Sequence, residues 1–163
     1  MKKFKKFAAL VLAGAAMLTL TACSSGVLFM NQFVARKTIL NEINAYCDTE
    51  LTEVKELSDV ERAYLEIFAK ADSASVDMET ADTDEYDAKL AEVEKNWEFQ
   101  SADGALLWGG KTSLTMPVSS VQELKQQIAK CGVFANPHGD SIGIATVTID
   151  GVTYWSFSIY SAK

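Results

Sequence analysis

Residues 141–149 read SIGIATVTI and residues 152–160 read VTYWSFSIY, with Asp150 and Gly151 between them. Both runs are rich in β-branched and aromatic residues, which favour strands. A two-residue type I′ turn needs positive φ at both central positions, and an Asp-Gly pair meets that need. The sequence therefore predicts an antiparallel hairpin at the C-terminus.

Four stretches upstream of this hairpin have apolar residues at the three-to-four spacing of an amphipathic helix. They predict helices over residues 37–47, 59–71, 86–97 and 121–128. Two of these helices follow Ser-x-x-Glu sequences, at Ser58 to Glu61 and at Ser120 to Glu123. In such a capping box the serine hydroxyl and the glutamate carboxylate accept hydrogen bonds from unpaired backbone N–H groups. Both sequences therefore predict helix starts.

The remaining segments complete the predicted architecture. Residues 105–108 and 114–118 predict two further strands, and the Asp/Ser/Thr/Glu-rich residues 72–84 predict a solvated loop. Helices come first, an antiparallel sheet comes last, and one helix lies between strands. This order predicts an α+β domain, layered as a three-layer α/β/α sandwich.

The first 23 residues have the parts of a bacterial export signal in order. Four lysines lie within residues 2–6, and the 14 residues from 7 to 20 are uncharged and mostly apolar. That length suits the apolar region of a signal peptide, because a membrane-spanning helix needs about 20 residues. Leu20-Thr21-Ala22-Cys23 then resembles the lipobox of bacterial lipoproteins, Leu-[Ala/Ser/Thr]-[Gly/Ala]-Cys.

The lipobox resemblance implies cleavage between Ala22 and Cys23 and transfer of diacylglycerol to the Cys23 thiol. Two or three acyl chains give a stable anchor, at about 0.8 kcal/mol for each buried CH₂. We therefore expect a signal peptide over residues 1–22, a lipidated N-terminus and short tether over 23–36, and a single domain over 37–163. The expected location is the extracytoplasmic face of a bacterial cell membrane. The alternative is an uncleaved helical anchor, because no charged residue occurs from position 7 to position 35.

Charge limits the range of partners. Without residues 1–22 the chain has 11 basic and 22 acidic residues, a net charge of −11. Surfaces that follow a phosphate backbone are basic, so nucleic acid is not an expected partner. The acidic excess lies in residues 48–103, with 18 acidic and 5 basic residues. Solvated helix faces and loops account for such a charge run.

Histidine and cysteine are too few for most catalytic or metal sites. His138 is the only histidine in the chain, which excludes zinc sites with two or three histidines. We expect no metal and no cofactor. Cys131 and His138 would form a thiol–imidazole pair if the fold brought them together. Alternatively, Cys131 is a small buried residue, or it forms a disulfide with Cys47 outside the reducing cytoplasm.

Several short motifs resemble the CAP superfamily (cysteine-rich secretory proteins, antigen 5 and pathogenesis-related proteins) in its bacterial secreted form. Residues 40–47, LNEINAYC, resemble the family's L-N-x-x-N-x-x-R helix, and residues 103–109 stand at the place of its G-E-N motif. Asn136-Pro137, followed after four residues by Ile142-Gly143, fits the family's N-P-x-x-x-x-I-G spacing. Residues 154–160, YWSFSIY, resemble its terminal Y-W-x-x-x-[FY] strand.

The departures from the family pattern concern its cleft, where two histidines and two acidic residues can hold a divalent metal. Aligning the motifs places Lys130 at a histidine position and Gly104 at the glutamate position. A lysine at that position would repel a cation. The resemblance thus implies a metal-free groove lined by Gly104 and Lys130, together with Trp108 or His138.

These observations lead to one main hypothesis and two alternatives. The main hypothesis is a non-catalytic CAP-like binding domain, anchored to the membrane, whose partner is an envelope protein, a peptide, a glycan or a lipid. The first alternative is a small α+β envelope lipoprotein of another fold that acts as an accessory subunit or an inhibitor. The second is an envelope enzyme that uses Cys131 and His138.

Overall fold

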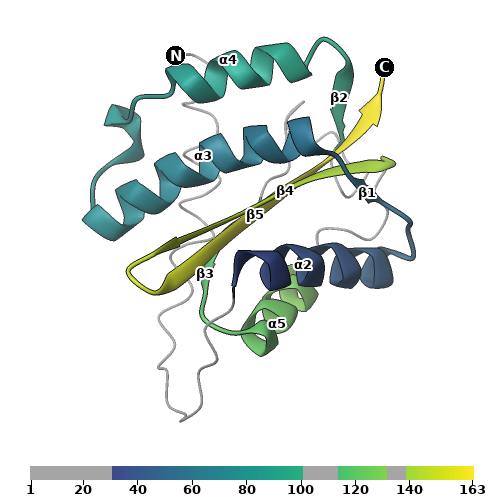
Figure 1. The fold of residues 1–163 in the computed structure, drawn as a ribbon, viewed down its shortest axis with the longest axis horizontal. Helices are drawn as coiled ribbons and strands as arrows, with labels where there is room; N and C mark the ends of the chain where they lie inside the picture. The colour runs from purple at the N-terminus through teal and green to yellow at the C-terminus, as the bar shows by residue number, and fades with distance from the viewer. Residues whose placement is uncertain (1–30, 101–113, 132–138) are drawn as a thin grey trace.

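A computed structural model describes residues 31–100, 114–131 and 139–163 of the chain. Over these residues it contains four α-helices, one short 3₁₀-helix and one five-stranded mixed sheet (Figure 1). The predicted α+β class is confirmed. In chain order the elements are α2 (Gln32–Cys47), β1 (Thr52–Glu53), α3 (Lys55–Ala74), η1 (Met78–Thr80), α4 (Asp84–Val93), β2 (Trp97–Gln100), β3 (Leu114–Val118), α5 (Val121–Cys131), β4 (Ser141–Ile149) and β5 (Val152–Ala162).

The C-terminal hairpin forms the centre of the sheet. β5 pairs with β4 along one edge and with β2 and β3 along the other, and all three pairings are antiparallel. The short β1 pairs in parallel with the start of β4. At the turn, Asp150 has φ 51° and Gly151 has φ 78°, as a type I′ turn requires. The predicted hairpin is therefore confirmed, as is the strand over residues 114–118.

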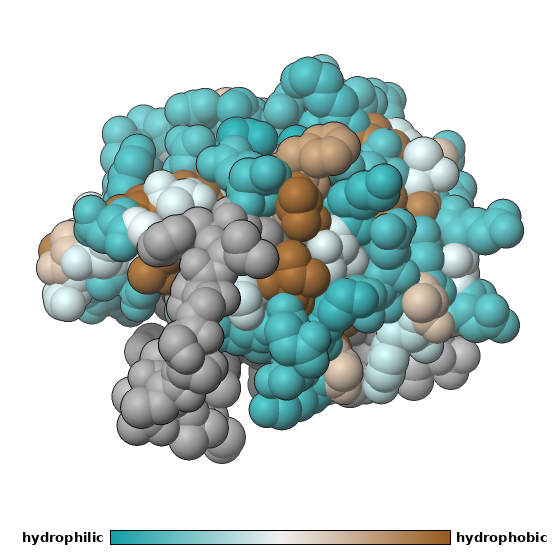
Figure 2. All heavy atoms as spheres, turned by 60° about the horizontal axis from the view of Figure 1, so that its bottom comes forward, coloured by the Kyte–Doolittle hydropathy of each residue, from teal (hydrophilic) through white to brown (hydrophobic). Residues whose placement is uncertain are grey.

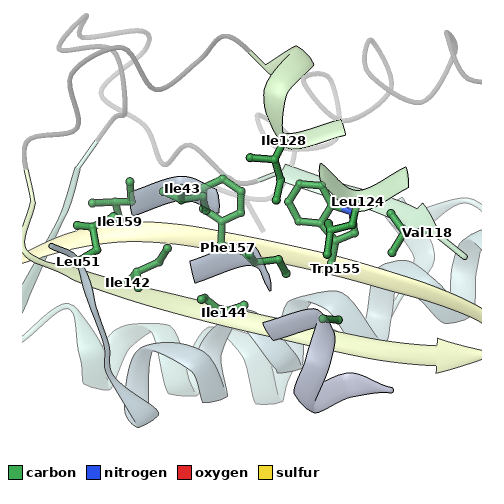
Figure 3. Packing of buried hydrophobic residues seen from close by; sticks show 12 residues of the cluster. Ile43, Leu51, Val118, Leu124, Ile128, Ile142, Ile144, Trp155, Phe157 and Ile159 are labelled. Atoms are coloured by element: carbon green, nitrogen blue, oxygen red, sulfur yellow. The ribbon is translucent and has the colours of Figure 1, made fainter. Parts of the chain in front are cut away.

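Helices cover both faces of this sheet, as Figure 1 shows. Side chains alternate between the faces of a strand, so each strand contributes to two cores. One core lies between the sheet and the helices α2 and α5 (Figure 3). Its largest members from the hairpin are Trp155 and Phe157, whose rings stack with centroids 5.7 Å apart. The indole Nε1 of Trp155 also donates a hydrogen bond to Gln127 of α5 at 3.1 Å.

The second core lies between the sheet and the helices α3 and α4. α3 crosses β4 at very close range, because the backbone of Leu57 passes directly over Gly143. A Cβ atom added at Gly143 would lie 2.6 Å from the carbonyl oxygen of Leu57. Glycine at this position therefore allows α3 to pack against the sheet backbone.

Three of the predicted helices have a wrong boundary. α3 begins at Lys55 and not at residue 59, and its N-cap residue, Val54, makes no capping hydrogen bond through its side chain. The predicted capping box at Ser58 and Glu61 is therefore wrong, because both residues lie inside the helix. α4 ends at Val93, and Trp97, which we predicted to end that helix, begins β2 instead.

The predicted start of α2 is also wrong, whereas the predicted start of α5 is confirmed. α2 begins at Gln32, five residues before the predicted start, with the Asn31 side chain as its N-cap. The capping function of Ser120 is confirmed, since its hydroxyl accepts a hydrogen bond from Glu123 N at 3.1 Å. The Glu123 carboxylate, however, accepts from the backbone and hydroxyl of Ser119. The predicted strand over residues 105–108 lies outside the described residues.

Candidate functional site

A carboxylate is buried between α3 and the centre of the sheet. Glu61 has only 4% of its surface exposed, although glutamate is rarely buried without polar partners. Its two carboxylate oxygens accept hydrogen bonds from the hydroxyls of Ser156, at 2.6 Å, and Ser158. The two serines lie two positions apart on β5, so both point to the same face of the strand. This arrangement satisfies both oxygens of a charge that would otherwise be costly to bury.

Three buried tyrosines of the core between the sheet and the helices α3 and α4 interact electrostatically with this carboxylate. Burial raises the pKa values of Tyr64, Tyr86 and Tyr160, and the negative charge of Glu61 is the second cause of each rise. The rings of Tyr64 and Tyr86 lie 5.7 Å apart and join α3 to α4. We call Glu61, Ser156, Ser158 and these three tyrosines the Glu61 cluster. Its phenols stay protonated at neutral pH, so the cluster contributes hydrogen-bonding hydroxyls and one carboxylate.

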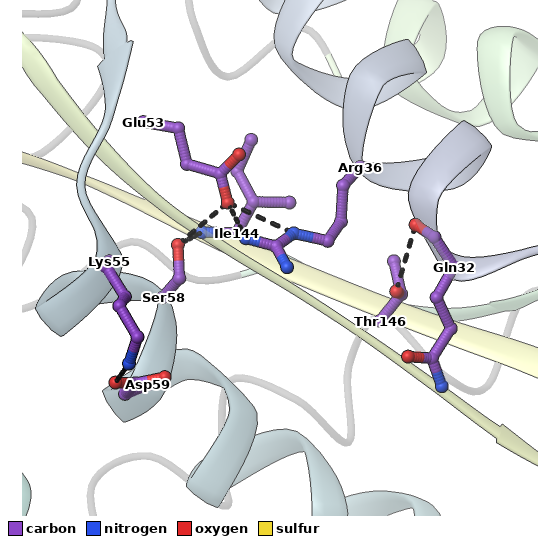
Figure 4. Close-up of polar contacts among 8 residues, drawn as sticks. All are labelled: Gln32, Arg36, Glu53, Lys55, Ser58, Asp59, Ile144 and Thr146. Atoms are coloured by element: carbon purple, nitrogen blue, oxygen red, sulfur yellow. Dashed lines mark hydrogen bonds and ion pairs between the residues drawn. The ribbon is translucent and has the colours of Figure 1, made fainter.

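A second polar network joins four elements at the edge of β4 (Figure 4). Arg36 of α2 forms an ion pair with Glu53 of β1, donating through both Nε, at 3.1 Å, and a terminal nitrogen. The Ser58 hydroxyl donates to the same Glu53 oxygen at 3.0 Å. It also accepts a hydrogen bond from the backbone N–H of Ile144 at 3.0 Å.

The position of Ser58 explains why this network is needed. β1 pairs with only the first two residues of β4. Beyond that point no strand of the described part of the chain pairs with this edge of β4, and a buried N–H such as that of Ile144 is costly without a partner. Ser58 supplies the missing acceptor from α3. The network thus completes the sheet edge and holds α2, α3 and β1 against β4.

Of the four residues predicted to line the groove, the structure describes only Lys130. Lys130 lies in the last turn of α5 and is exposed to solvent. Gly104, Trp108 and His138 lie outside the described residues, so the groove remains a prediction. Within the described part of the chain, no group of three or more His, Cys, Asp or Glu side chains is placed to hold a metal ion.

The cysteine predictions also stay open. Cys47 ends α2 and is half-buried, and burial raises the pKa of its thiol. Cys131 ends α5, and its side chain lies outside the described residues. α2 and α5 are joined by an ion pair between Glu42 and Lys125 at 2.5 Å. The disulfide between Cys47 and Cys131 therefore stays a prediction, as does lipidation at Cys23 beside Ala22, which both lie outside the described residues.

The Glu61 cluster was missed because its parts lie far apart in the sequence. Ser58 and Glu61 match a helix-start motif, so we did not predict that both side chains are buried and form hydrogen bonds to the sheet. A signal was present in residues 155–159, WSFSI, where two serines alternate with aromatic and aliphatic residues in a predicted strand. Small polar residues on a buried strand face require a polar partner from the element packed against it.

Comparisons with known proteins identify no relative of this chain. No protein-family model matches it, and no significant match was found among curated proteins or solved structures.

Proposed function

We propose that the chain is a bacterial lipoprotein that anchors a non-catalytic binding domain to the extracytoplasmic face of the cell membrane. The observation that carries the proposal is the sequence from Lys2 to Cys23, a basic start, an apolar stretch and a lipobox in order. The fold is compatible with processing at that site. All described helices and strands follow Cys23, and α2 begins only at Gln32. Cleavage before Cys23 would therefore remove none of them.

The non-catalytic part of the proposal is supported by the contacts of two acidic residues, Glu61 and Glu53. The carboxylate of Glu61 is enclosed by Ser156 and Ser158 and holds α3 on the sheet. Glu53 is likewise occupied by Arg36 and Ser58. These acids thus serve packing, whereas general acid or base catalysis requires contact with a substrate. The domain would bind an envelope protein, a peptide, a glycan or a lipid.

The CAP-like architecture is part of the same proposal. Its support is a central antiparallel hairpin with α2 and α5 on one face of the sheet and α3 and α4 on the other. An experimental structure of residues 24–163 tests this part. The proposal requires that Gly104 and Lys130 face a common groove, and their placement on separate surfaces would contradict it.

Lipidation is tested by metabolic labelling with an alkyne fatty acid in bacterial cells that produce the full chain. We expect label on the wild-type protein and none on Cys23→Ala, which would also retain its signal peptide. Cys47→Ala is the matched control, because it removes another thiol of the chain and should keep the label. Equal labelling of wild type and Cys23→Ala would contradict the proposal.

The non-catalytic role is tested by metal binding. Isothermal titration of the purified protein with zinc should give no tight binding, since Lys130 replaces the histidine of the CAP motif. Stoichiometric zinc binding that survives a competing weak chelator would contradict this part of the proposal.

A further inference from the structure

Two large apolar side chains are exposed in the first turn of α2. Phe33 is 75% exposed and its neighbour Val34 is 37% exposed. Among the other described residues, only two large hydrophobic side chains are exposed, those of Tyr46 at 49% and Val76 at 56%. Tyr46 lies at the far end of α2, and Val76 lies just after α3, beyond the opposite face of the sheet. Phe33 is thus the most exposed of the four, at the start of the described domain.

The same end of α2 is basic. Lys37 follows Phe33 by four residues, so the two side chains lie on one face of the helix. Residues 31–41 contain no acidic residue; of their two basic residues, Arg36 is paired with Glu53 of β1, and Lys37 is exposed to solvent. An exposed aromatic ring beside a long basic side chain suits the surface of an anionic bilayer, because the ring enters the headgroup region while the ammonium stays among phosphates.

The two helical layers differ in charge in a way that orients the domain. α2 and α5 together carry four basic and two acidic residues, a net charge of +2. α3 and α4 together carry four basic and nine acidic residues, a net charge of −5. Figure 2 turns the side with α2 and α5 toward the viewer and shows hydrophobic residues exposed among hydrophilic ones. An anionic surface attracts this side and repels the other.

Chain length keeps this surface near the membrane. Phe33 follows Cys23 by ten residues. Even when fully extended, ten residues span at most about 36 Å, which is less than the thickness of a bilayer with its headgroups. If Cys23 carries acyl chains, the start of α2 lies no more than about 36 Å from the anchored residue.

From these observations we infer that the start of α2, with Phe33, Val34 and Lys37, rests on the anionic bilayer that anchors Cys23. This surface fixes the domain with its α2 and α5 side toward the membrane and its acidic α3 and α4 side toward the envelope space. The inference rests on the proposed lipidation, since the acyl anchor supplies the proximity.

The test is photo-crosslinking of the full chain in bacterial cells. A benzophenone amino acid replaces Phe33 in one variant and Val76 in another, which is the matched control because Val76 is also exposed but lies on the acidic side. After irradiation, mass spectrometry counts lipid adducts at each position. Burial of a phenylalanine-sized side chain in lipid supports a population ratio of about tenfold, so we expect at least about tenfold more adducts at position 33.

A second arm tests the charge requirement. The purified lipidated protein is placed in vesicles of phosphatidylcholine alone or of phosphatidylcholine with phosphatidylglycerol. Adducts at position 33 should increase with phosphatidylglycerol, and Lys37→Glu should remove that increase.

The outcomes distinguish a failure of this inference from a failure of the proposed lipidation of Cys23. Fatty acid labelling of the same samples reports whether Cys23 is acylated. If the protein is acylated and position 33 gives no more lipid adducts than position 76, the inference is overturned. Adducts at position 33 to a protein instead of lipid overturn it as well. Absence of acylation refutes the proposed function, and the inference then falls with it.

Discussion

Replacement of Ser156 by alanine removes one of the two serine hydrogen bonds to the buried carboxylate of Glu61. Ser156 is fully buried, and its hydroxyl lies 2.6 Å from Glu61 Oε2. Alanine fits the space, because the substitution removes one oxygen atom and adds nothing. A hydrogen bond to a charged group contributes about 1.5–3 kcal/mol, so we expect the free energy of unfolding to fall by about 2 kcal/mol.

Urea unfolding of residues 24–163, followed by tryptophan fluorescence and circular dichroism, measures this loss. For a domain of this size a loss of 2 kcal/mol lowers Tm by about 4–8 °C. Ser141→Ala is the control. Ser141 is also a buried serine of the hairpin, but its hydroxyl bonds to the exposed Asp140, so we expect a loss below about 0.5 kcal/mol.

A double-mutant cycle shows whether the carboxylate is the cause. In a Glu61→Gln background the acceptor of Ser156 is neutral, and a neutral hydrogen bond contributes about 1 kcal/mol. The cost of Ser156→Ala should therefore be smaller by about 1 kcal/mol in that background. Two results would refute the reasoning. One is a loss no larger than that of Ser141→Ala, and the other is an equal loss in both backgrounds.

Two further predictions concern the α3 side of the sheet. Folding keeps the phenols of Tyr64, Tyr86 and Tyr160 protonated, because their pKa values lie above that of an unfolded tyrosine. Stability should thus be unaffected by these groups below pH 10 and fall above it, by about 1.4 kcal/mol per pH unit for each tyrosine. Urea midpoints measured from pH 9 to pH 11 check the sign, and a flat profile would contradict it. Gly143→Ala should cost about 1–3 kcal/mol, because the new methyl group would press on the Leu57 carbonyl. Unchanged thermal stability of this variant would show that α3 does not pack so closely.

The C-terminal hairpin was predictable because its signals are local. Asp150-Gly151 fixes the turn, and the strands on either side fix the register, from Ile149 opposite Val152 to Ser141 opposite Tyr160. The start of α5 at Ser120 was predictable for the same reason, since the hydroxyl and the N–H it caps are three residues apart.

The missed features depend on pairings across the chain. Trp97 continues the helical spacing of α4, yet it begins β2 and pairs with Ala162 of β5, 65 residues away along the chain. Ser58 and Glu61 have the spacing of a capping box, but their partners are Ile144 and the serines of β5. Local patterns cannot reveal such partners, because the fold itself brings them together.

The candidate groove does not follow from local patterns and stays a prediction. Lys130 was assigned to it by its position in the CAP motif, and the structure shows that this residue is exposed in the last turn of α5. The other three residues, Gly104, Trp108 and His138, lie outside the described residues. Their convergence was inferred from the CAP resemblance alone.

The most direct test of the proposed function is mass spectrometry of the N-terminal peptide of the protein purified from bacterial membranes. The account predicts a peptide that begins at Cys23 and carries diacylglycerol, with or without a third acyl chain. A peptide that begins at Met1, or an unmodified Cys23, would contradict it.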